Sequence, residues 1–356
     1  MSDHPYRHLP DEAYWRRSVA RADGMVDPVA GDFPRLLPTD RVATAGSCFA
    51  QHIARHLEAA GFHRLVTETA HPLMPADAAR AAGYGLFTAR YGNIYTTLQL
   101  LQLLDRAERR FVPHEPAWGL PDGRLADPFR PTVQPTGFGS LAELEDDRAQ
   151  HLAAVAEMMR TLDVLVFTLG LTETWVSRVD GAAFPLCPGV AAGRFDPDRH
   201  AFRNLTAGEV RGQLAAAIGQ LRAVNPAARV ILTVSPVPLA ATMSGRHVLA
   251  ATTYSKAVLR VAAQEVADTL PGVWYFPSYE IVTGPQARGR YFADDLREVT
   301  PEGVARVMSI FLRHAGGIEH GEVATPSPAN PQPSAGAGWV ASMCDEAMLD
   351  RADGGD

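Results

Sequence analysis

Gly46-Ser47-Cys48-Phe49-Ala50 follows the short apolar run Val42–Ala45 and leads into a helix-like stretch, Gln51–Ala60. This order predicts a buried strand that turns sharply through glycine and serine into a helix at the carboxyl edge of a sheet. The turn places Cys48 above that edge and points the N–H groups of the helix N-terminus toward its sulfur. Those donors favour the thiolate, the reactive form of cysteine. Cys48 is therefore either a nucleophile or, like many free cysteines, a small buried apolar residue.

The composition fits a folded protein outside the oxidising compartments. The chain has 356 residues, of which 46% are hydrophobic, and a net charge of −7, which speaks against a nucleic-acid partner. It has three cysteines without metal-ligand spacing, which argues against a disulfide framework and a metal site. It also has no apolar run of membrane length and no signal-peptide segment at its beginning. We therefore expect a cytoplasmic protein that contacts neither nucleic acid nor membrane.

Strand-like and helix-like segments alternate along the chain. This alternation predicts a mostly parallel sheet covered by helices on both faces, with ligands bound at the carboxyl ends of the strands. The predicted strands are Arg41–Ala45, Asp163–Leu169, Arg229–Ser235 and Gly272–Phe276. The predicted helices are Cys48–Ala60, Thr97–Arg110, Leu141–Leu162, Ala207–Val224, Thr253–Thr269 and Pro301–Ala315.

Four stretches depart from this alternation. Residues 1–40 have no clear period and are expected to wrap the domain. Residues 113–139 and 177–204 are rich in Pro, Gly and Asp, and long ordered insertions of this kind form lids or pocket walls. After residue 316 the composition shifts to Gly, Ala, Pro and Ser, which predicts a flexible C-terminal tail over 317–356, with a short docking helix at Trp339–Leu349.

Five ordered blocks resemble the GSCFA family, a group related to SGNH hydrolases. The resemblance covers roughly residues 40–315 and implies a three-layer α/β/α, flavodoxin-like fold for a catalytic domain over 41–316. The first block is the family signature itself. The blocks are Gly46–Ala50, Tyr91–Tyr95, Thr168–Trp175, Thr233–Pro238 with Tyr254–Ala257, and Tyr291–Asp295.

The resemblance also implies roles for individual residues. SGNH hydrolases carry Gly-Asp-Ser in the first block with serine as nucleophile, which places Cys48 at the nucleophile position and Ser47 at the aspartate position. The last block of the family usually ends Asp-x-x-His, but here it reads Asp295-Leu296-Arg297-Glu298. The histidine is absent. Either Glu298 replaces it, another residue supplies the base, or the thiolate needs no strong base.

The SGNH layout further implies an oxyanion hole built from three blocks. The corresponding groups are the Cys48 N–H, Gly92 with Asn93, and the turn from Gly170 to Glu173. Asn93 is either such a donor or a turn residue. Thr172 either donates its hydroxyl or caps a helix. Glu173 orients a base, binds a substrate amine or accepts the first N–H groups of a helix.

Several residues are candidates for completing the catalytic machinery. Asp295 is expected to orient a histidine, unless it is only a charged turn residue. His247 is the preferred base because it follows the strand that ends at Ser235; the alternatives are His71, His200 and His52. A second cysteine and three basic residues are weaker candidates for roles in the site. Cys187 is a pocket cysteine or a buried loop residue, and Arg90, Arg246 and Lys256 are candidate contacts for an anionic group.

These observations favour a cysteine-nucleophile enzyme, a hydrolase or an acyltransferase, that acts on an ester, thioester or activated amide through an acyl group on Cys48. The expected partner is a small-molecule or glycan acyl substrate, free or carrier-bound. No cofactor motif is present. Two alternatives stay open: an acyltransferase that modifies a polysaccharide or natural-product scaffold, and a carbohydrate- or metabolite-binding protein without catalysis.

Overall fold

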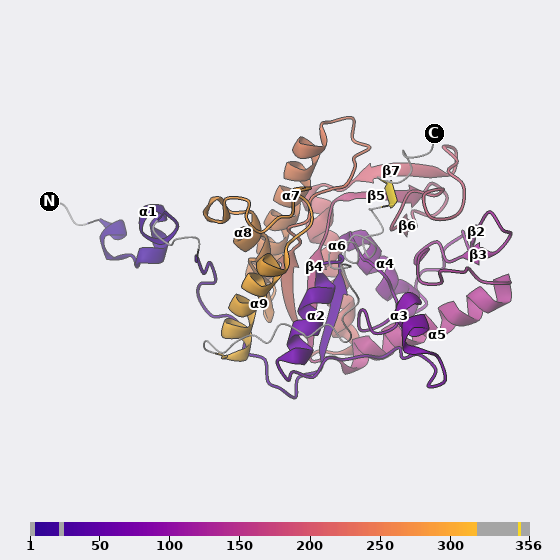
Figure 1. Cartoon of the computed structure of the whole chain (residues 1–356), viewed down its shortest axis with the longest axis horizontal. Coiled ribbons are helices and arrows are strands. Elements are labelled where there is room, and N and C mark those ends of the chain that lie inside the picture. Colours follow the sequence, from indigo (N-terminus) through magenta and orange to yellow (C-terminus); the bar gives the residue numbers. More distant parts are fainter. Residues whose placement is uncertain (1–3, 21–24, 319–347, 350–356) are drawn as a thin grey trace.

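The computed structural model describes residues 4–20, 25–318 and 348–349 and has a four-stranded parallel sheet at its centre (Figure 1). The strands lie in the order β1-β4-β8-β9 and are parallel throughout. The predicted parallel sheet is thus confirmed. Its strands are β1 (Val42–Gly46), β4 (Val164–Leu169), β8 (Arg229–Val234) and β9 (Val273–Phe276).

The segment after α2 (Ala50–Ala59) takes the place of a further strand beside β1. The Val42 N–H donates to the His63 carbonyl (2.9 Å), and the Leu65 N–H donates to the Val42 carbonyl (3.0 Å). Val42 and Arg64 form a parallel bridge. With this bridge the order becomes 2-1-3-4-5, the flavodoxin-like arrangement. The order reverses between β1 and β4, and ligands of such sheets bind at the carboxyl ends of the strands at this point.

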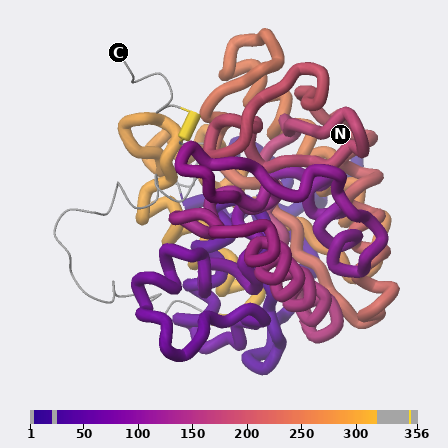
Figure 2. The backbone as a smooth tube through the Cα atoms, turned by 90° about the vertical axis from the view of Figure 1, so that its right-hand side faces the viewer, coloured from indigo at the N-terminus to yellow at the C-terminus, as the bar shows by residue number. Residues whose placement is uncertain are grey.

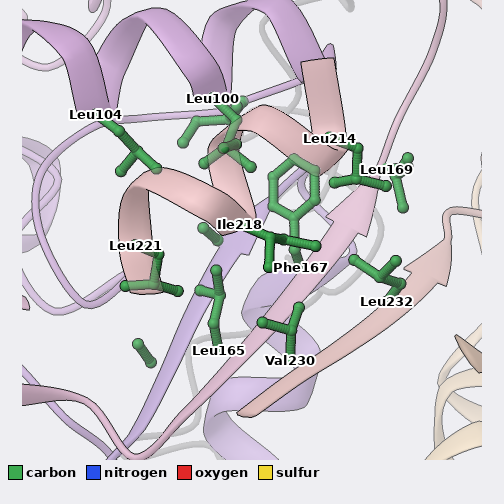
Figure 3. Close-up of a cluster of buried hydrophobic side chains, with 14 of the residues drawn as sticks. Leu100, Leu104, Leu165, Phe167, Leu169, Leu214, Ile218, Leu221, Val230 and Leu232 are labelled. Carbon is green, nitrogen blue, oxygen red and sulfur yellow. The ribbon is translucent and has the colours of Figure 1, made fainter. Parts of the chain in front are cut away.

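Helices cover both faces of the sheet, which gives three layers. One face packs against α2, α8 (Ser278–Thr283) and α9 (Pro301–Gly316). The other packs against α4 (Thr97–Ala107), α6 (Ala207–Val224) and α7 (Val248–Thr269), and α5 (Leu141–Thr161) adds to that side through contacts with α4 and α6. Alternate residues of β4 explain the two cores, because successive side chains of a strand point to opposite faces. Figure 3 shows Leu165, Phe167 and Leu169 beside the leucines of α4 and α6.

The predicted helices are present, and two of them begin elsewhere than predicted. Cys48 lies outside α2, which starts at Ala50. α7 starts at Val248, five residues before the predicted Thr253, because the His247 side chain accepts the Leu249 N–H and caps the helix.

The two insertions form one packed unit at the side of the domain (Figure 1). Trp118 of the first insertion and Phe184 of the second lie in one buried cluster, with ring centroids 5.1 Å apart. The Gly193 N–H also donates to the Gly119 carbonyl (2.9 Å). The first insertion contains the antiparallel pair β2 (Trp118–Gly119) and β3 (Leu125–Ala126). β5 (Glu173–Ser177) leads into the second insertion and pairs antiparallel with two strands of it, β6 (Ala183–Phe184) and β7 (His200–Asn204).

The connection between α2 and α4, which contains α3 (Ala76–Ala81), lies beside α5. Figure 2 shows this connection in purple next to the magenta helix. Two contacts join them: His151 lies 2.7 Å from Glu68, and Arg90 lies 2.7 Å from Asp147.

The N-terminal segment reaches the main core through Phe33, which packs on Phe276 and Phe311. The Leu36 N–H donates to the carbonyl of Ala315 in α9 (2.7 Å). Figure 1 shows η1 (Pro5–His8), η2 (Asp11–Ala13) and α1 (Trp15–Ser18) apart from the sheet. The predicted tail and docking helix lie almost wholly outside the described residues. Within those residues, no helix combines the length and apolar character needed to cross a lipid bilayer.

The end of β1 depends on a close approach between two backbones. Gly46 has φ +132°, and a Cβ atom there would lie 2.2 Å from the carbonyl oxygen of Thr168 on β4. Any side chain at position 46 would therefore push β1 and β4 apart, in a region of φ that residues with a Cβ atom rarely adopt.

We predict that Gly46→Ala lowers the free energy of unfolding by about 3 kcal/mol or more, because it adds both a clash and backbone strain. Urea unfolding followed by circular dichroism measures this. Gly212→Ala is the matched control, since Gly212 is an exposed glycine of α6 with open space around it; it should stabilise by about 0.5–1 kcal/mol. Equal effects of the two substitutions would contradict the close-approach argument.

Candidate active site

The carboxyl ends of β1 and β4 carry the residues of the first and third sequence blocks. Cys48 lies on the turn between β1 and α2 and is 8% exposed. The turn is fixed on both sides: the Ser47 N–H donates to the Thr168 carbonyl (3.2 Å), and the Ala50 N–H donates to the Ser47 carbonyl (2.9 Å). This position is the point where the strand order reverses, so Cys48 occupies the place where ligands of this fold class bind.

Two backbone donors stand beside the thiol. Among the described residues, no acceptor receives the N–H groups of Cys48 and Phe49, although both residues are buried. They precede the first turn of α2, where the helix dipole adds partial positive charge. A negatively charged oxygen at this turn would satisfy both groups.

The loop over residues 91–95 crosses from β1 to β4 above the sheet. The Ile94 N–H donates to the Gly46 carbonyl (2.8 Å), and the Tyr95 carbonyl accepts the N–H groups of Gly170 (3.0 Å) and Leu171 (3.1 Å). Gly92 permits the bend through its φ of +68°. The structure thus brings the Gly92-Asn93 loop to the same sheet edge as Cys48, as the sequence predicted.

The turn from Gly170 to Glu173 has other roles than the sequence predicted. The Gly170 N–H is already bonded to Tyr95, and the Thr172 hydroxyl donates to Asn204 Oδ1 (2.6 Å). Neither group is therefore available to a substrate oxyanion. Capping by Thr172 or Glu173 is also wrong, because strand β5 follows the turn instead of a helix. The alternation of β-formers over Glu173–Ser177 was the signal for this strand.

Glu173 and His247 hold loops in place. The Glu173 carboxylate accepts hydrogen bonds from the Thr242 hydroxyl (2.6 Å) and the Met243 N–H (3.3 Å). His247 is exposed and its Nδ1 accepts the Leu249 N–H (3.2 Å). A neutral histidine that accepts at Nδ1 carries its proton on Nε2. In this arrangement His247 caps α7, and its assignment as the general base stays a prediction.

The loop before α9 carries two candidate carboxylates, Asp295 and Glu298. Glu298 occupies the position where the Asp-x-x-His pattern has histidine. Asp295 is exposed, and its Oδ1 accepts the N–H groups of Arg297 (3.0 Å) and Glu298 (2.9 Å). Among the described residues Asp295 bonds to no histidine, so its predicted orienting role finds no recipient. Glu298 is half-buried, and its carboxylate accepts no hydrogen bond from a described residue. Burial, and then the charge of Asp295, raise the pKa of Glu298.

The other candidate histidines have structural contacts. His200 accepts the Asp196 N–H at Nδ1 (3.1 Å) and lies 3.3 Å from Glu115 at Nε2. His71 accepts the Leu73 N–H (3.2 Å). Burial, followed by the charge of Arg55, lowers the pKa of His52 to about 3, so that His52 is neutral near pH 7.

Two buried residues of α7 support the edge of the site, and the sequence gave Lys256 a different role. The Ser255 hydroxyl accepts the Thr172 N–H (3.0 Å), and Lys256 Nζ donates to the Gly170 carbonyl (2.6 Å). Both side chains are almost fully buried. Both residues belong to the Tyr254–Ala257 block, which could have marked them as part of this edge. The sequence did not show that the block contacts the turn after β4.

Cys187 lies in the second insertion and is only partly buried. Its Sγ lies 3.5 Å from the Pro188 carbonyl oxygen. Burial raises the pKa of the Cys187 thiol to about 11, so it is protonated near neutral pH. The third cysteine, Cys344, lies outside the described residues.

The chain is thus an α/β protein with a parallel sheet. Its Cys48 lies on the turn between β1 and α2, where the strand order reverses. The model of the GSCFA family matches residues 41–311, and the chain belongs to this family. Its structure is similar to that of a family 3 carbohydrate esterase from Clostridium thermocellum, with 12% sequence identity, a TM-score of 0.33, and coverage of 77% of this chain and 94% of that chain. No curated protein matches the chain.

We predict that Ser255→Ala destabilises the protein by about 1–3 kcal/mol, because it leaves the buried Thr172 N–H without an acceptor. Thr253→Ala is the control: it removes a hydroxyl two residues away, on an exposed position of the same helix. Thermal and urea unfolding of both variants measure the difference. A loss no larger than that of the control would show that Ser255 does not hold the turn.

Proposed function

We propose that the chain is a cysteine-dependent acyl-transfer enzyme that carries its acyl intermediate on Cys48. The observation that supports this most directly is the pair of unbonded N–H groups at Cys48 and Phe49, next to the thiol. Preorganised donors of this kind stabilise the oxyanion of acyl transfer.

The proposed reaction has two steps. The Cys48 thiolate attacks the carbonyl carbon of an ester, thioester or activated amide, and the C–S bond forms while negative charge develops on the carbonyl oxygen. The N–H groups of Cys48 and Phe49, together with the Gly92-Asn93 loop, hold that oxygen. The bond to the leaving group then breaks, and the leaving group departs with a proton. In the second step water, a hydroxyl or an amine attacks the thioester and restores the thiol.

Glu298 is our candidate for the base that activates the acceptor. Its raised pKa brings it closer to neutrality, which suits proton transfer. Its carboxylate has no hydrogen-bond donor among the described residues. Phe49 and Val299, the chain neighbours of Cys48 and Glu298, belong to the same buried cluster, which holds the two loops on one side of the sheet.

We expect Cys48 to react with iodoacetamide and with activated acyl esters at least about tenfold faster than Cys187 near pH 7.5, because the Cys187 thiol is protonated there. Intact-protein mass spectrometry with peptide mapping measures both reactions. The acyl adduct should disappear in Cys48→Ala and persist in Cys187→Ala. An adduct that persists in Cys48→Ala, or no adduct with any donor, would contradict the proposal and favour a non-catalytic binding protein.

A second substitution tests the base. Glu298→Gln should slow release of the acyl group by roughly 10²–10⁴-fold, the usual contribution of a general base, while alkylation of Cys48 stays unchanged. Glu302→Gln, an exposed carboxylate in the first turn of α9, is the control. Rapid-quench measurement of acyl-enzyme decay separates the two steps. Decay in Glu298→Gln at the rate of the control would remove Glu298 from the mechanism.

A further inference from the structure

A cluster of buried charges lies between α5, the first insertion and the connection before α4. Asp147 lies 2.7 Å from both Arg90 and Arg130. Asp127 lies 3.1 Å from Arg130 and 3.2 Å from Arg148. These ion pairs join three segments that are distant in the sequence.

Two further members complete the cluster, Glu68 and His151. Glu68 lies 3.7 Å from the Arg90 guanidinium and 2.7 Å from His151 Nδ1. Burial, followed by the charge of Arg130, lowers the pKa of His151 to about 4. His151 is therefore neutral near pH 7, and its Nδ1–H donates to Glu68. Within the described residues its Nε2 has no hydrogen-bond partner.

Arg106 of α4 adds a fourth guanidinium to this region without an ion pair of its own. It is only 5% exposed, and its guanidinium stacks on the Phe129 ring, with Cζ 3.9 Å from the ring centroid. Its Nε and Nη2 atoms are buried and have no hydrogen-bond partner among the described residues. Burial lowers the pKa of Arg106 to about 10, which leaves it charged near pH 7.

The charges of the cluster do not balance. The guanidinium groups of Arg90, Arg106, Arg130 and Arg148 face the carboxylates of Glu68, Asp127 and Asp147, while His151 is neutral. One positive charge is therefore in excess, and Arg106 is the member without a direct carboxylate contact. Buried charges are stable only when they are paired. The excess predicts an anion.

A small cavity lies where that anion would bind. Its volume is about 20 Å³, more than the roughly 10–15 Å³ that one water molecule requires. Arg106 and His151, whose buried nitrogens have no hydrogen-bond partner among the described residues, both line it, together with Arg130. Asn93 and Ile94 line it too, and the Ile94 N–H is bonded to Gly46 beside the candidate active site.

We propose that this cavity is a site for a small monoanion, a carboxylate or a halide, bound by the Nε and Nη2 donors of Arg106. The anion is either free in solution or the carboxylate of an acyl donor whose carbonyl lies at Cys48; the second source rests on the proposed function. The small volume excludes larger anionic groups.

The first test measures the free anion in the full-length protein. Formate is titrated at constant ionic strength, with the bulky HEPES anion as balance, while the thermal midpoint is followed. The midpoint should rise saturably by about 2–6 °C in the wild type and in Arg160→Gln, which removes an exposed arginine, and should not change in Arg106→Met. No rise in the wild type, or the same rise in Arg106→Met, would overturn the proposal.

Bromide diffraction provides a test that does not depend on a variant. An anomalous peak next to Arg106 in wild-type crystals soaked in bromide would support the site. Bromide is first titrated in the same thermal assay. An empty cavity in crystals soaked at a bromide concentration that saturates this thermal shift would overturn the proposal.

A matched pair of activated esters identifies the source of the anion. If the donor's carboxylate binds here, a succinyl ester should acylate Cys48 faster than the butyryl ester in the wild type, and Arg106→Met should abolish that preference. Equal rates together with stabilisation by formate would assign the site to a free anion. If neither ester acylates Cys48, the proposed function fails, and the formate and bromide results still decide the anion site.

Discussion

The contact between Gly46 and the Thr168 backbone is the constraint on which the rest of the site depends. Because no Cβ atom fits there, β1 and β4 stay in close register up to their carboxyl ends, and the chain leaves β1 by a sharp turn. This turn places Cys48 and Phe49 just before α2, where their N–H groups have no acceptor among the described residues. A residue with a side chain at position 46 would disturb every one of these features together.

Four of the five sequence blocks meet because they satisfy backbone groups of one another. Ile94 donates to the carbonyl of Gly46, Tyr95 accepts from Gly170, and Ser255 accepts from Thr172. Irregular backbone at the end of a parallel sheet has no ladder partner, so these contacts replace the missing hydrogen bonds. In this view the second, third and fourth blocks are supports that hold the turn of Cys48 in place.

The sequence predicted the sheet, its helices and the location of the site, because apolar runs and helical periods are local signals. It did not predict the role of Thr172 or Glu173, since their hydrogen bonds go to Asn204 and to the loop after β8, which no spacing in the sequence reveals. His247 was preferred as a base because it follows the end of a predicted strand. The sequence did not show that its side chain accepts the Leu249 N–H and caps α7. Arg90 was named from the sequence only as a candidate contact for an anionic group, because its ion pairs with Glu68 and Asp147 join distant segments that no spacing in the sequence connects.

Some polar groups around this edge, such as the Thr172 hydroxyl, are hydrogen-bonded within the protein, whereas others, such as the buried hydroxyls of Ser47 and Thr168, have no hydrogen-bond partner among the described residues. A residue whose hydrogen bonds are complete holds the fold, whereas a buried donor or charge without a partner carries a cost that folding alone does not explain. By this criterion the N–H groups of Cys48 and Phe49, the hydroxyls of Ser47 and Thr168, and Arg106 differ from Thr172, whose hydroxyl is bonded within the protein. Cys48 with its two neighbouring N–H groups follows the carboxyl end of β1, and Arg106 lines a cavity together with Asn93 and Ile94 of the loop that crosses this edge.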